Sequence, residues 1–252
     1  TTDGTAPTES STLYSGPIAV SKTQVITAAG FRTNYTTSST VSRSYTITDF
    51  SVPWKTGIAY GSVLDARDGQ TYRTVKIGTQ TWMAQALNYS ANGTLGVCSG
   101  GNQAGCDKFG RLYTWSETRG ISTHYDSTLR GGTDVGVAGI CPADYHVPSL
   151  AEWKTLESEV DATKAQSGYI LKATAGWSTT PGSDDYGFRG LPAGGYVIPT
   201  GYYAQGTANY LWSATESDEG TAYGPDLYDT QTGFASTWNN KYRSTTLRCI
   251  AD

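Results

Sequence analysis

The sequence predicts an α+β domain, with two helices on a mainly antiparallel and irregular sheet, behind a small all-β domain. Three observations predict this class. Apolar and polar residues alternate through residues 1–48 without a helical period, and two helix signals occur among the strands that follow. The 252 residues include 30 Gly, 18 Tyr and 7 Trp, a composition typical of strands and turns.

The first domain is expected to be a small β-sandwich over residues 1–48. Turns at Asp3-Gly4-Thr5 and Ser15-Gly16-Pro17 separate its short strands. The alternation within each strand indicates a half-buried sheet. These strands are predicted at Leu13–Tyr14, Ile18–Val20, Gln24–Ala29 and Ser42–Ile47.

Residues 49–62 are predicted to be a linker with room for one short strand, because Pro53 and Gly57 interrupt a segment without a clear period. The second domain then covers residues 63–252. It opens with a turn and two strands that form a hairpin, at Asp65–Gly69, Gln70–Ile77 and Gln80–Met83.

Two helices are predicted in the second domain. The first covers Gly110–Ser116, and the second begins at Ser149, which forms a capping box with Glu152. The second helix has a continuous apolar stripe of Leu150, Trp153, Leu156 and Val160. After residue 168 the chain is predicted to return to short strands and Gly-rich loops.

The cysteine pattern favours an oxidising compartment. The chain has four cysteines, and none has the spacing of a metal site: Cys98, Cys106, Cys141 and Cys249. An even number in a chain rich in Tyr, Gly, Ser and Thr favours disulfides and an extracellular location, with four free thiols as the alternative. Three connectivities are possible. The short separation of Cys98 and Cys106 favours a local loop, which leaves Cys141 to reach Cys249.

Charge and motif content argue against several function classes. Lys+Arg 18 against Asp+Glu 22 gives a net charge of −4, so no basic surplus is present for nucleic acid. No stretch reaches the ~18–20 apolar residues of a membrane span. We expect no enzyme, because the common hydrolase, nucleotide-binding and zinc-protease motifs are missing. His146 is expected to hydrogen-bond near a helix start, and Asp184-Asp185 to form a turn.

Residues 1–48 resemble the immunoglobulin-like repeat found at the C-terminus of chitobiase-type enzymes and in bacterial surface proteins. The resemblance rests on TTDGTAPTESSTLYSGPIAV, QVITAAGF and VSRSYTI. That family has two strands before its TTDGT turn, whereas this sequence starts at Thr1, so we expect a mature chain or a fragment. The resemblance implies an incomplete sandwich, completed by upstream residues of the parent protein or by a strand from a neighbouring chain.

Residues 63–252 resemble the Fibrobacter-type major paralogous domain, a family of secreted bacterial and archaeal modules. Six blocks carry the resemblance: DARDGQTYRTVKIGTQTWMAQALNY, CDKFGRLYTW, GICPADYHVPSLAEWKTL, DDYGFRGLPAGGY, LWSATES and LRCIAD. The resemblance implies a C-type-lectin-like fold, which formylglycine-generating enzymes share. Those enzymes need a reactive cysteine pair, whereas all four cysteines of this chain match structural positions of the paralogous domain. It also implies an interior structural frame made of Trp82, Trp115, Trp153, Trp212 and a Cys141–Cys249 disulfide.

Members of this fold include the variable proteins of diversity-generating retroelements, whose varied residues lie between the WS and RC blocks. In this chain that region is Ser213–Leu247, preceded by the loop Val197–Asn209. Seven of the 18 tyrosines fall between Tyr196 and Tyr242, a composition typical of a binding surface, although each aromatic residue taken singly is as readily a core residue. Leu227, Phe234 and Leu247 are expected to be interior. The residues expected on the exposed face are Asp226, Tyr228, Thr230, Thr237, Trp238, Asn239, Asn240 and Tyr242, with Thr200 and Tyr202 of the preceding loop as neighbours. The predicted ligand-binding residues are these ten together with Asp229 and Gln231.

The resemblance suggests one cofactor to consider, a calcium ion bound as in calcium-dependent lectins. Trp238-Asn239-Asn240 resembles the Trp-Asn-Asp element of calcium-dependent lectins, and Gly224-Pro225-Asp226 resembles their sugar loop. Calcium needs about six to eight oxygen ligands, including carboxylates. Asn240 stands where that element has Asp, and no acidic residue precedes the proline. We therefore expect no metal or other cofactor. Asp218 and Glu219 could contribute carboxylates to an ion, but a turn is the commoner explanation for them.

These observations predict an extracellular binding protein of receptor or adhesin type. Its C-terminal surface would bind a surface protein or glycan of another cell or virus. One alternative is a structural subunit of a surface filament or layer. Another is a calcium-independent carbohydrate-binding module that stacks sugar rings on Tyr228 or Trp238.

Overall fold

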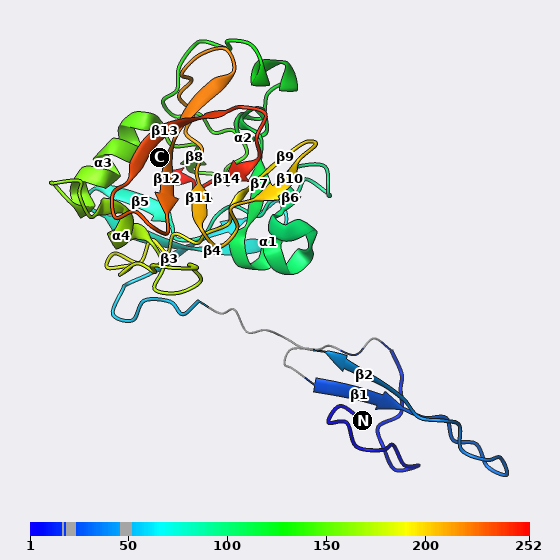
Figure 1. The fold of residues 1–252 in the computed structure, drawn as a ribbon. Helices are drawn as coiled ribbons and strands as arrows, with labels where there is room; N and C mark the ends of the chain where they lie inside the picture. The colour runs from blue at the N-terminus through cyan, green and yellow to red at the C-terminus, as the bar shows by residue number, and fades with distance from the viewer. Residues whose placement is uncertain (17, 19–23, 46–51) are drawn as a thin grey trace. The chain divides into compact units, whose positions relative to one another are not determined.

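The computed structural model describes residues 1–16, 18, 24–45 and 52–252. They belong to two compact units, Thr1–Ser51 and Val52–Asp252 (Figure 1). Several antiparallel sheets and a few short helices make up the chain, an architecture compatible with the predicted α+β class.

The first unit contains the antiparallel pair β1 (Gln24–Ala28) and β2 (Val41–Tyr45). The start of the chain lies along β1. The amino group of Thr1 donates to the carbonyl oxygen of Thr27 at 2.8 Å, and the Thr27 N–H donates back to the Thr1 carbonyl at 3.1 Å. These reciprocal bonds add an extended segment to the edge of the pair.

Three of the strands expected in the first unit differ from the structure or extend beyond the described residues. The prediction of a strand at Leu13–Tyr14 is wrong, because both residues lie outside any strand and their side chains are exposed. A two-residue apolar segment is too short for alternation to identify a buried face. Residues 19–20 and 46–47, from the predicted strands Ile18–Val20 and Ser42–Ile47, lie outside the described residues.

The main sheet of the second unit has five antiparallel strands. Their order in the sheet is β3 (Gly61–Asp65), β4 (Gln70–Ile77), β5 (Gln80–Met83), β15 (Ile250–Ala251) and β8 (Tyr145–His146). Strands β4 and β5 occupy the residues predicted for them. Strand β15, near the end of the chain, pairs with β5 on one side and with β8 on the other, so it joins these two strands in the main sheet.

Three smaller sheets complete the second unit. One joins β14 (Thr245–Thr246), β7 (Arg111–Tyr113) and β6 (Val97–Cys98). Another pairs β9 (Gly195–Val197) with β10 (Gly201–Tyr203). The third joins β11 (Ala208–Tyr210), β12 (Thr221–Tyr228) and β13 (Ala235–Asn240), and it carries half of the predicted ligand-binding residues.

The predicted helix at Ser149 is confirmed as α3 (Leu150–Val160). Ser149 and Glu152 form the capping box, and Trp153, Leu156 and Val160 are buried. The imidazole of His146 lies 2.9 Å from a Glu152 carboxylate oxygen, which confirms its hydrogen bond near the helix start. The remaining helices are α1 (Gln103–Phe109), α2 (Trp115–Arg119) and α4 (Ser167–Leu171), with 3-10 turns at Ser99–Gly101 and Thr123–Asp126.

The prediction of a helix over Gly110–Ser116 is wrong. Residues Arg111–Tyr113 form strand β7, which pairs with β14 on one side and β6 on the other. Helix α2 begins only after Thr114, whose side chain forms a capping box with Glu117. The pairing with distant strands overrides the local sequence, because both neighbours come from other parts of the chain.

Residues 52–62, expected to be part of a linker, belong to the second unit. Val52 is buried, and Trp54, Ile58 and Tyr60 pack against the core. Strand β3 then begins at Gly61. The segment showed no period because its apolar residues contact the core irregularly and not from one face of a regular element.

Four tryptophans and the Cys141–Cys249 disulfide form the interior frame that was expected from the family resemblance. Trp82, Trp115, Trp153 and Trp212 have no exposed surface, and we call these four residues the tryptophan frame. The indole N–H of Trp115 donates to the Ser213 carbonyl at 2.9 Å, and that of Trp153 to the Trp212 carbonyl at 3.2 Å. The frame therefore fixes the segment that leads to β12. The predicted pairs Cys98–Cys106 and Cys141–Cys249 are confirmed.

Candidate ligand-binding site

Strands β12 and β13 divide the predicted residues between two faces of their sheet. Their register pairs Gly224 with Thr237 and Tyr223 with Trp238. Since successive side chains of a strand point to opposite faces, Thr237 lies on one face and Trp238 on the other. The expectation that residues 237–240 share one exposed face is therefore wrong.

The Asp226 carboxylate is the polar centre of one face. It is 2% exposed and accepts hydrogen bonds from the Tyr228 hydroxyl at 3.1 Å, from the Asn239 amide at 3.2 Å and from the Thr237 hydroxyl. Burial raises its pKa to about 6, although these hydrogen bonds act to lower it. The carboxyl group thus titrates close to neutral pH.

Three tyrosines surround Asp226, and we call Tyr203, Tyr210 and Tyr228 the tyrosine cluster. The rings of Tyr203 and Tyr210 are 5.5 Å apart, and those of Tyr210 and Tyr228 are 6.0 Å apart in an edge-to-face arrangement. The guanidinium of Arg243 lies 5.7 Å from the Tyr203 ring centre. Burial raises the pKa of Tyr203 to about 12 and also raises that of Tyr228, so both phenols keep their protons at neutral pH.

The predicted residues differ in their exposure. Trp238 is 61% exposed, Tyr242 53% and Tyr202 42%, which makes them the large aromatic side chains open to a ligand. Thr200, Thr230 and Gln231 are also exposed, and Tyr228, Thr237 and Asn240 are half-buried. Asp226, Asp229 and Asn239 are buried, so the expectation of exposure is wrong for Asp226 and Asn239. Leu227, Phe234 and Leu247 are interior, as predicted.

A buried lysine holds the loop between β12 and β13. The Lys172 ammonium lies 2.9 Å from the Tyr228 carbonyl oxygen, 3.1 Å from that of Gln231 and 3.4 Å from that of Asp229. It also contacts the Thr180 carbonyl at 3.1 Å. Burial lowers its pKa. These contacts fix the backbone of the loop, while the side chains of Thr230 and Gln231 stay exposed.

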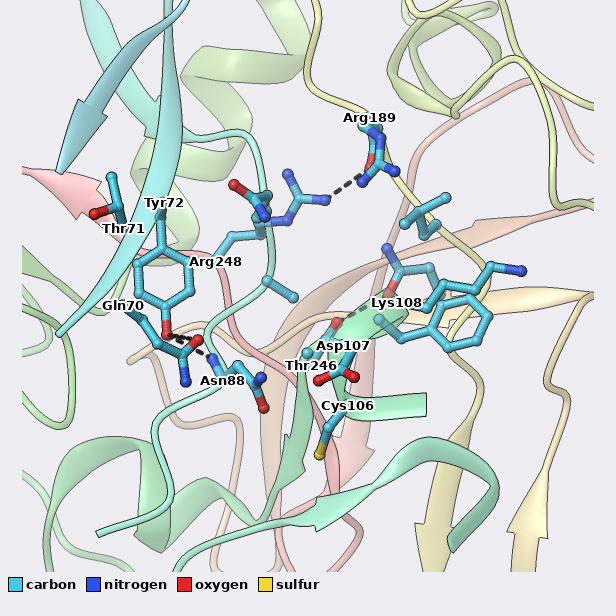
Figure 2. A pocket seen from close by; sticks show the side chains of 16 residues that line it. Gln70, Thr71, Tyr72, Asn88, Cys106, Asp107, Lys108, Arg189, Thr246 and Arg248 are labelled. Atoms are coloured by element: carbon cyan, nitrogen blue, oxygen red, sulfur yellow. Dashed lines mark hydrogen bonds between the residues drawn. The ribbon is translucent and has the colours of Figure 1, made fainter. Parts of the chain in front are cut away.

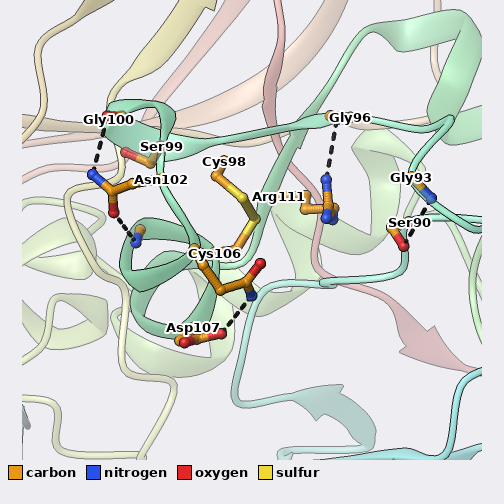
Figure 3. The surroundings of a disulfide bond; sticks show 12 residues. Ser90, Gly93, Gly96, Cys98, Ser99, Gly100, Asn102, Cys106, Asp107 and Arg111 are labelled. Atoms are coloured by element: carbon orange, nitrogen blue, oxygen red, sulfur yellow. Dashed lines mark hydrogen bonds between the residues drawn. A yellow bond between two sulfur atoms is a disulfide. The ribbon is translucent and has the colours of Figure 1, made fainter. Parts of the chain in front are cut away.

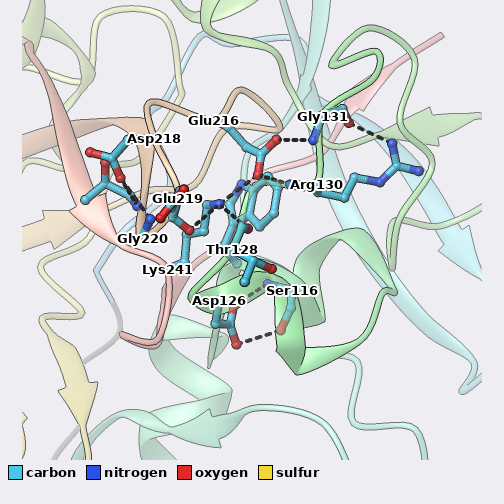
Figure 4. A network of polar contacts seen from close by, with 12 residues as sticks. Ser116, Asp126, Thr128, Arg130, Gly131, Glu216, Asp218, Glu219, Gly220 and Lys241 are labelled. Carbon is cyan, nitrogen blue, oxygen red and sulfur yellow. Dashed lines mark hydrogen bonds and ion pairs between the residues drawn. The ribbon is translucent and has the colours of Figure 1, made fainter.

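A second buried lysine follows β13 (Figure 4). The Lys241 ammonium is 2.7 Å from a Glu216 carboxylate oxygen and 3.0 Å from the Glu219 carbonyl. Glu216 also accepts the backbone N–H groups of Arg130 and Gly131, each at 2.8 Å. The network joins the end of β13 to two loops that are distant in the sequence.

The Cys98–Cys106 disulfide anchors the loop beside β10 (Figure 3). Next to it, the Ser99 hydroxyl donates to the Ala193 carbonyl at 2.6 Å and accepts from the Gln205 amide at 2.9 Å. On the β9–β10 pair the rings of Tyr196 and Tyr202 are 4.8 Å apart. The exposed Tyr202 is thus supported by its own hairpin and by a cross-linked neighbour.

Comparison with protein families identifies the second unit. The model of the Fibrobacter succinogenes major domain matches residues 75–251. The chain belongs to this family. A second model, described as Fn3 associated, matches residues 1–45. No curated protein and no solved structure matches the chain.

Asp218, one of the two acidic residues considered for an ion, has structural partners. Asp218 accepts the backbone N–H groups of Gly220 and Thr221 at 2.9 and 2.8 Å, as expected for a turn carboxylate. Within the described part of the chain no group of His, Cys, Asp or Glu is arranged to hold a metal. None of the helices described there is long and apolar enough to cross a membrane.

Sequence reasoning missed several residues of this site in the major domain. Tyr203 and Tyr210 lie in the tyrosine-rich segment, but only strand pairing shows that they meet Tyr228. Lys172 carried a signal, since a single lysine in the apolar stretch YILKATAGW indicates burial. Nothing in the sequence indicated that Arg243 would approach Tyr203.

Proposed function

We propose that the chain is an extracellular ligand-binding protein of receptor or adhesin type. Its ligand is a surface protein or glycan of another cell or virus. One observation carries the proposal: Trp238, Tyr242 and Tyr202 expose large aromatic surface on strands and turns held by buried groups beneath them. Aromatic side chains on a rigid support are typical binding hot spots. The two disulfides support an extracellular location.

The finer proposal concerns the fold and its variation. The major domain takes a C-type-lectin-like fold, and the segment between Trp212 and Leu247 is diversified by a retroelement. Two features support this: the ends of the segment are buried, while Thr230, Trp238 and Tyr242 within it project outward. The test is to search the DNA beside the gene for a near-copy of the codons for residues 196–252, differing mainly at adenines, next to a reverse transcriptase gene.

The proposal assigns binding and no catalysis. Its support is that the conspicuous ionisable groups have structural roles. His146 is held between Glu152 and Asp252, at 2.9 and 2.7 Å. Asp184 accepts the Arg189 backbone N–H beside the turn at residues 185–186.

A calcium-independent carbohydrate-binding module, which need not bind another cell or virus, is the second candidate function, and Trp238 favours it. Its indole is the most exposed of the large aromatic side chains in the major domain, and a flat exposed ring suits stacking against a sugar. If the chain has this function, a glycan array should show binding in the absence of calcium.

The binding test uses fluorescently labelled chain on a panel of intact bacterial, archaeal and eukaryotic cells and virus particles. The double variant Trp238→Ala/Tyr242→Ala should lose at least about 10-fold in affinity, as for central hot spots. Tyr35→Ala is the matched control, because Tyr35 is an exposed tyrosine of the first unit. Equal binding by the double variant would contradict the proposed site. Absence of binding across the panel would favour a structural subunit.

A further inference from the structure

The second unit contains a polar cavity of about 70 Å³, lined by none of the residues of the tyrosine cluster (Figure 2). Its walls come from β4, the segment after β5, the end of α1, residues 189–191, β11, β14 and the segment before β15. The lining is dominated by polar and charged side chains, among them Tyr72, Asn88, Asp107, Lys108, Arg189 and Arg248.

The guanidinium of Arg248 is fully buried beside this cavity. Its Nη1 donates to the Phe188 carbonyl at 2.6 Å and to the Met83 carbonyl at 3.1 Å, and its Nη2 donates to the Arg189 carbonyl at 2.8 Å. Two N–H groups of the guanidinium remain, one on Nη2 and one on Nε, and the Nε atom is buried without a hydrogen-bond partner. Buried donors of charged groups are rarely left unpaired, so this atom requires an explanation.

Arg189 repeats the arrangement. Its Nη2 donates to the Val52 carbonyl at 2.9 Å, and its Nε is also buried without a partner. Among the residues that the structure describes, neither guanidinium is in an ion pair. The nearby Asp184 accepts the backbone N–H of Arg189. Burial raises the pKa of its carboxyl group to about 6, so at neutral pH it is largely ionised and supplies one negative charge for the two guanidinium groups.

The cations around the cavity disfavour one another. Burial and the neighbouring Arg189 lower the pKa of Arg248 to about 9. Burial lowers the pKa of Lys108 as well, and Arg189 contributes to that shift. The chain has a net charge of −4, whereas the cavity is lined by three cationic side chains, Lys108, Arg189 and Arg248, and by one acidic side chain, Asp107. A negatively charged group in the cavity would relieve both the repulsion and the cost of burial.

Asn88 contributes a hydrogen-bond acceptor to the cavity. Its side-chain oxygen Oδ1 is buried without a partner and lines the same cavity. The cavity therefore offers two unused cationic donors and one unused acceptor. Water molecules would complete these hydrogen bonds but would add no negative charge beside the two guanidinium groups, which share the single carboxylate of Asp184.

We propose that this cavity binds a protonated oxyanion of the phosphate type. Its charged oxygens accept from the Nε–H groups of Arg189 and Arg248, and its hydroxyl donates to Oδ1 of Asn88. Arginine is well suited to such oxygens because its donors have a fixed geometry. A cavity of about 70 Å³ has room for a few water-sized groups, enough for a four-oxygen ion.

The test titrates the full chain with sodium phosphate at constant ionic strength and follows the arginine Nε–H signals by NMR. We expect saturable shifts of the Arg189 and Arg248 signals. Sodium sulfate has no proton to donate to Asn88, so it should bind about 10-fold more weakly. Absence of saturable shifts with phosphate would overturn the proposal, and equal binding of sulfate would remove Asn88 from it.

A matched pair of charge variants tests the site. Asn88→Asp places a negative charge at the cavity and should weaken phosphate binding at least about 10-fold. Asn92→Asp makes the same change at an exposed loop position outside the lining and should leave binding unchanged. Lys108→Gln provides a second lining variant, with reduced affinity expected, if Asn88→Asp does not fold. Equal phosphate affinity in wild type and lining variants would contradict the site.

A free ion and the phosphate ester of a larger molecule carry the same recognised group. Glucose 6-phosphate, titrated in the same way, distinguishes these sources. Because the cavity has no room for a sugar, binding of the ester with similar affinity would show that the group enters from an open mouth. Binding of inorganic phosphate alone would identify a free-ion site.

Discussion

The tryptophan frame and the aromatic surface of the major domain use the same residue types in different surroundings. Trp153 is fully buried, contacts Trp82 with ring centres 4.4 Å apart, and donates its indole N–H to a backbone carbonyl. Trp238 is 61% exposed and stands on the outer side of β13. The frame therefore supplies stability, and the aromatic surface supplies contact area that folding does not use.

Between these two regions lies an intermediate layer of buried polar groups. Asp226 joins side chains of β12 and β13, Lys172 holds the loop between these strands, and Lys241 holds the end of β13, which precedes the exposed Tyr242. This layer explains how the outer residues could change without loss of the fold. The predictions below separate the three layers by the size of their effect on stability.

The largest effect is expected for the frame. Trp153→Ala removes a fully buried indole and its hydrogen bond, so the free energy of unfolding should fall by ~3–5 kcal/mol. Trp238→Ala is the matched control and should change it by about 0.5 kcal/mol or less. Denaturant unfolding measures both. A similar loss in the two variants would show that the frame and the aromatic surface are not distinct.

Loss of the long disulfide should have the next largest effect. The Cys141–Cys249 bond closes a loop of 108 residues and Cys98–Cys106 one of 8, and longer loops restrict the unfolded chain more. Replacing Cys141 and Cys249 by Ala should cost ~2–5 kcal/mol. The same replacement at Cys98 and Cys106 should cost less. The reverse order, measured by thermal unfolding, would contradict this reasoning.

Lys172→Met tests the intermediate layer. Methionine keeps the length of the side chain but leaves the carbonyl oxygens of Tyr228, Asp229 and Gln231 without their donor. The expected loss is ~1–3 kcal/mol, with faster hydrogen exchange in the loop between β12 and β13. Lys154→Met is the control, since Lys154 is exposed on α3. Unchanged exchange in this loop would show that Lys172 does not fix it.

The smallest effect is a pH dependence. Burial raises the pKa of Asp226 to about 6, above the value of about 3.9 for an unfolded aspartate. The folded state therefore holds the extra proton between these values, and the free energy of unfolding should fall as pH rises from about 4 to about 6. Asp226→Asn should reduce this slope, and Asp185→Asn, at an exposed position, should not. An unchanged slope in Asp226→Asn would contradict the raised pKa.

Local signals in the sequence predicted part of this architecture. Alternation identified Gln70–Ile77 and Gln80–Met83, and the capping box identified the start of α3. Chain separation pointed to the two cysteine pairs. Each of these signals works because the interacting residues lie within a few positions of one another, or because few partners are available.

The candidate site was predicted less completely. The exposed Trp238, Tyr242 and Tyr202 were among the predicted residues, but Asp226 and Asn239 were expected to be exposed and are buried. Composition indicates which residue types are present, whereas exposure depends on which face of a strand is covered. A shift of one position reverses that face.

The sequence by itself determined the family, the hairpin of β4 and β5, helix α3 and the tyrosine-rich segment in which the candidate site lies. Only the tertiary structure decided which side chains of that segment face outward and which partners hold it. Lys172 is 59 residues from Gln231, whose carbonyl oxygen it contacts. Arg248 is 165 residues from Met83, whose carbonyl oxygen accepts its hydrogen bond. Such contacts leave no local period, because they form only when distant segments pack together.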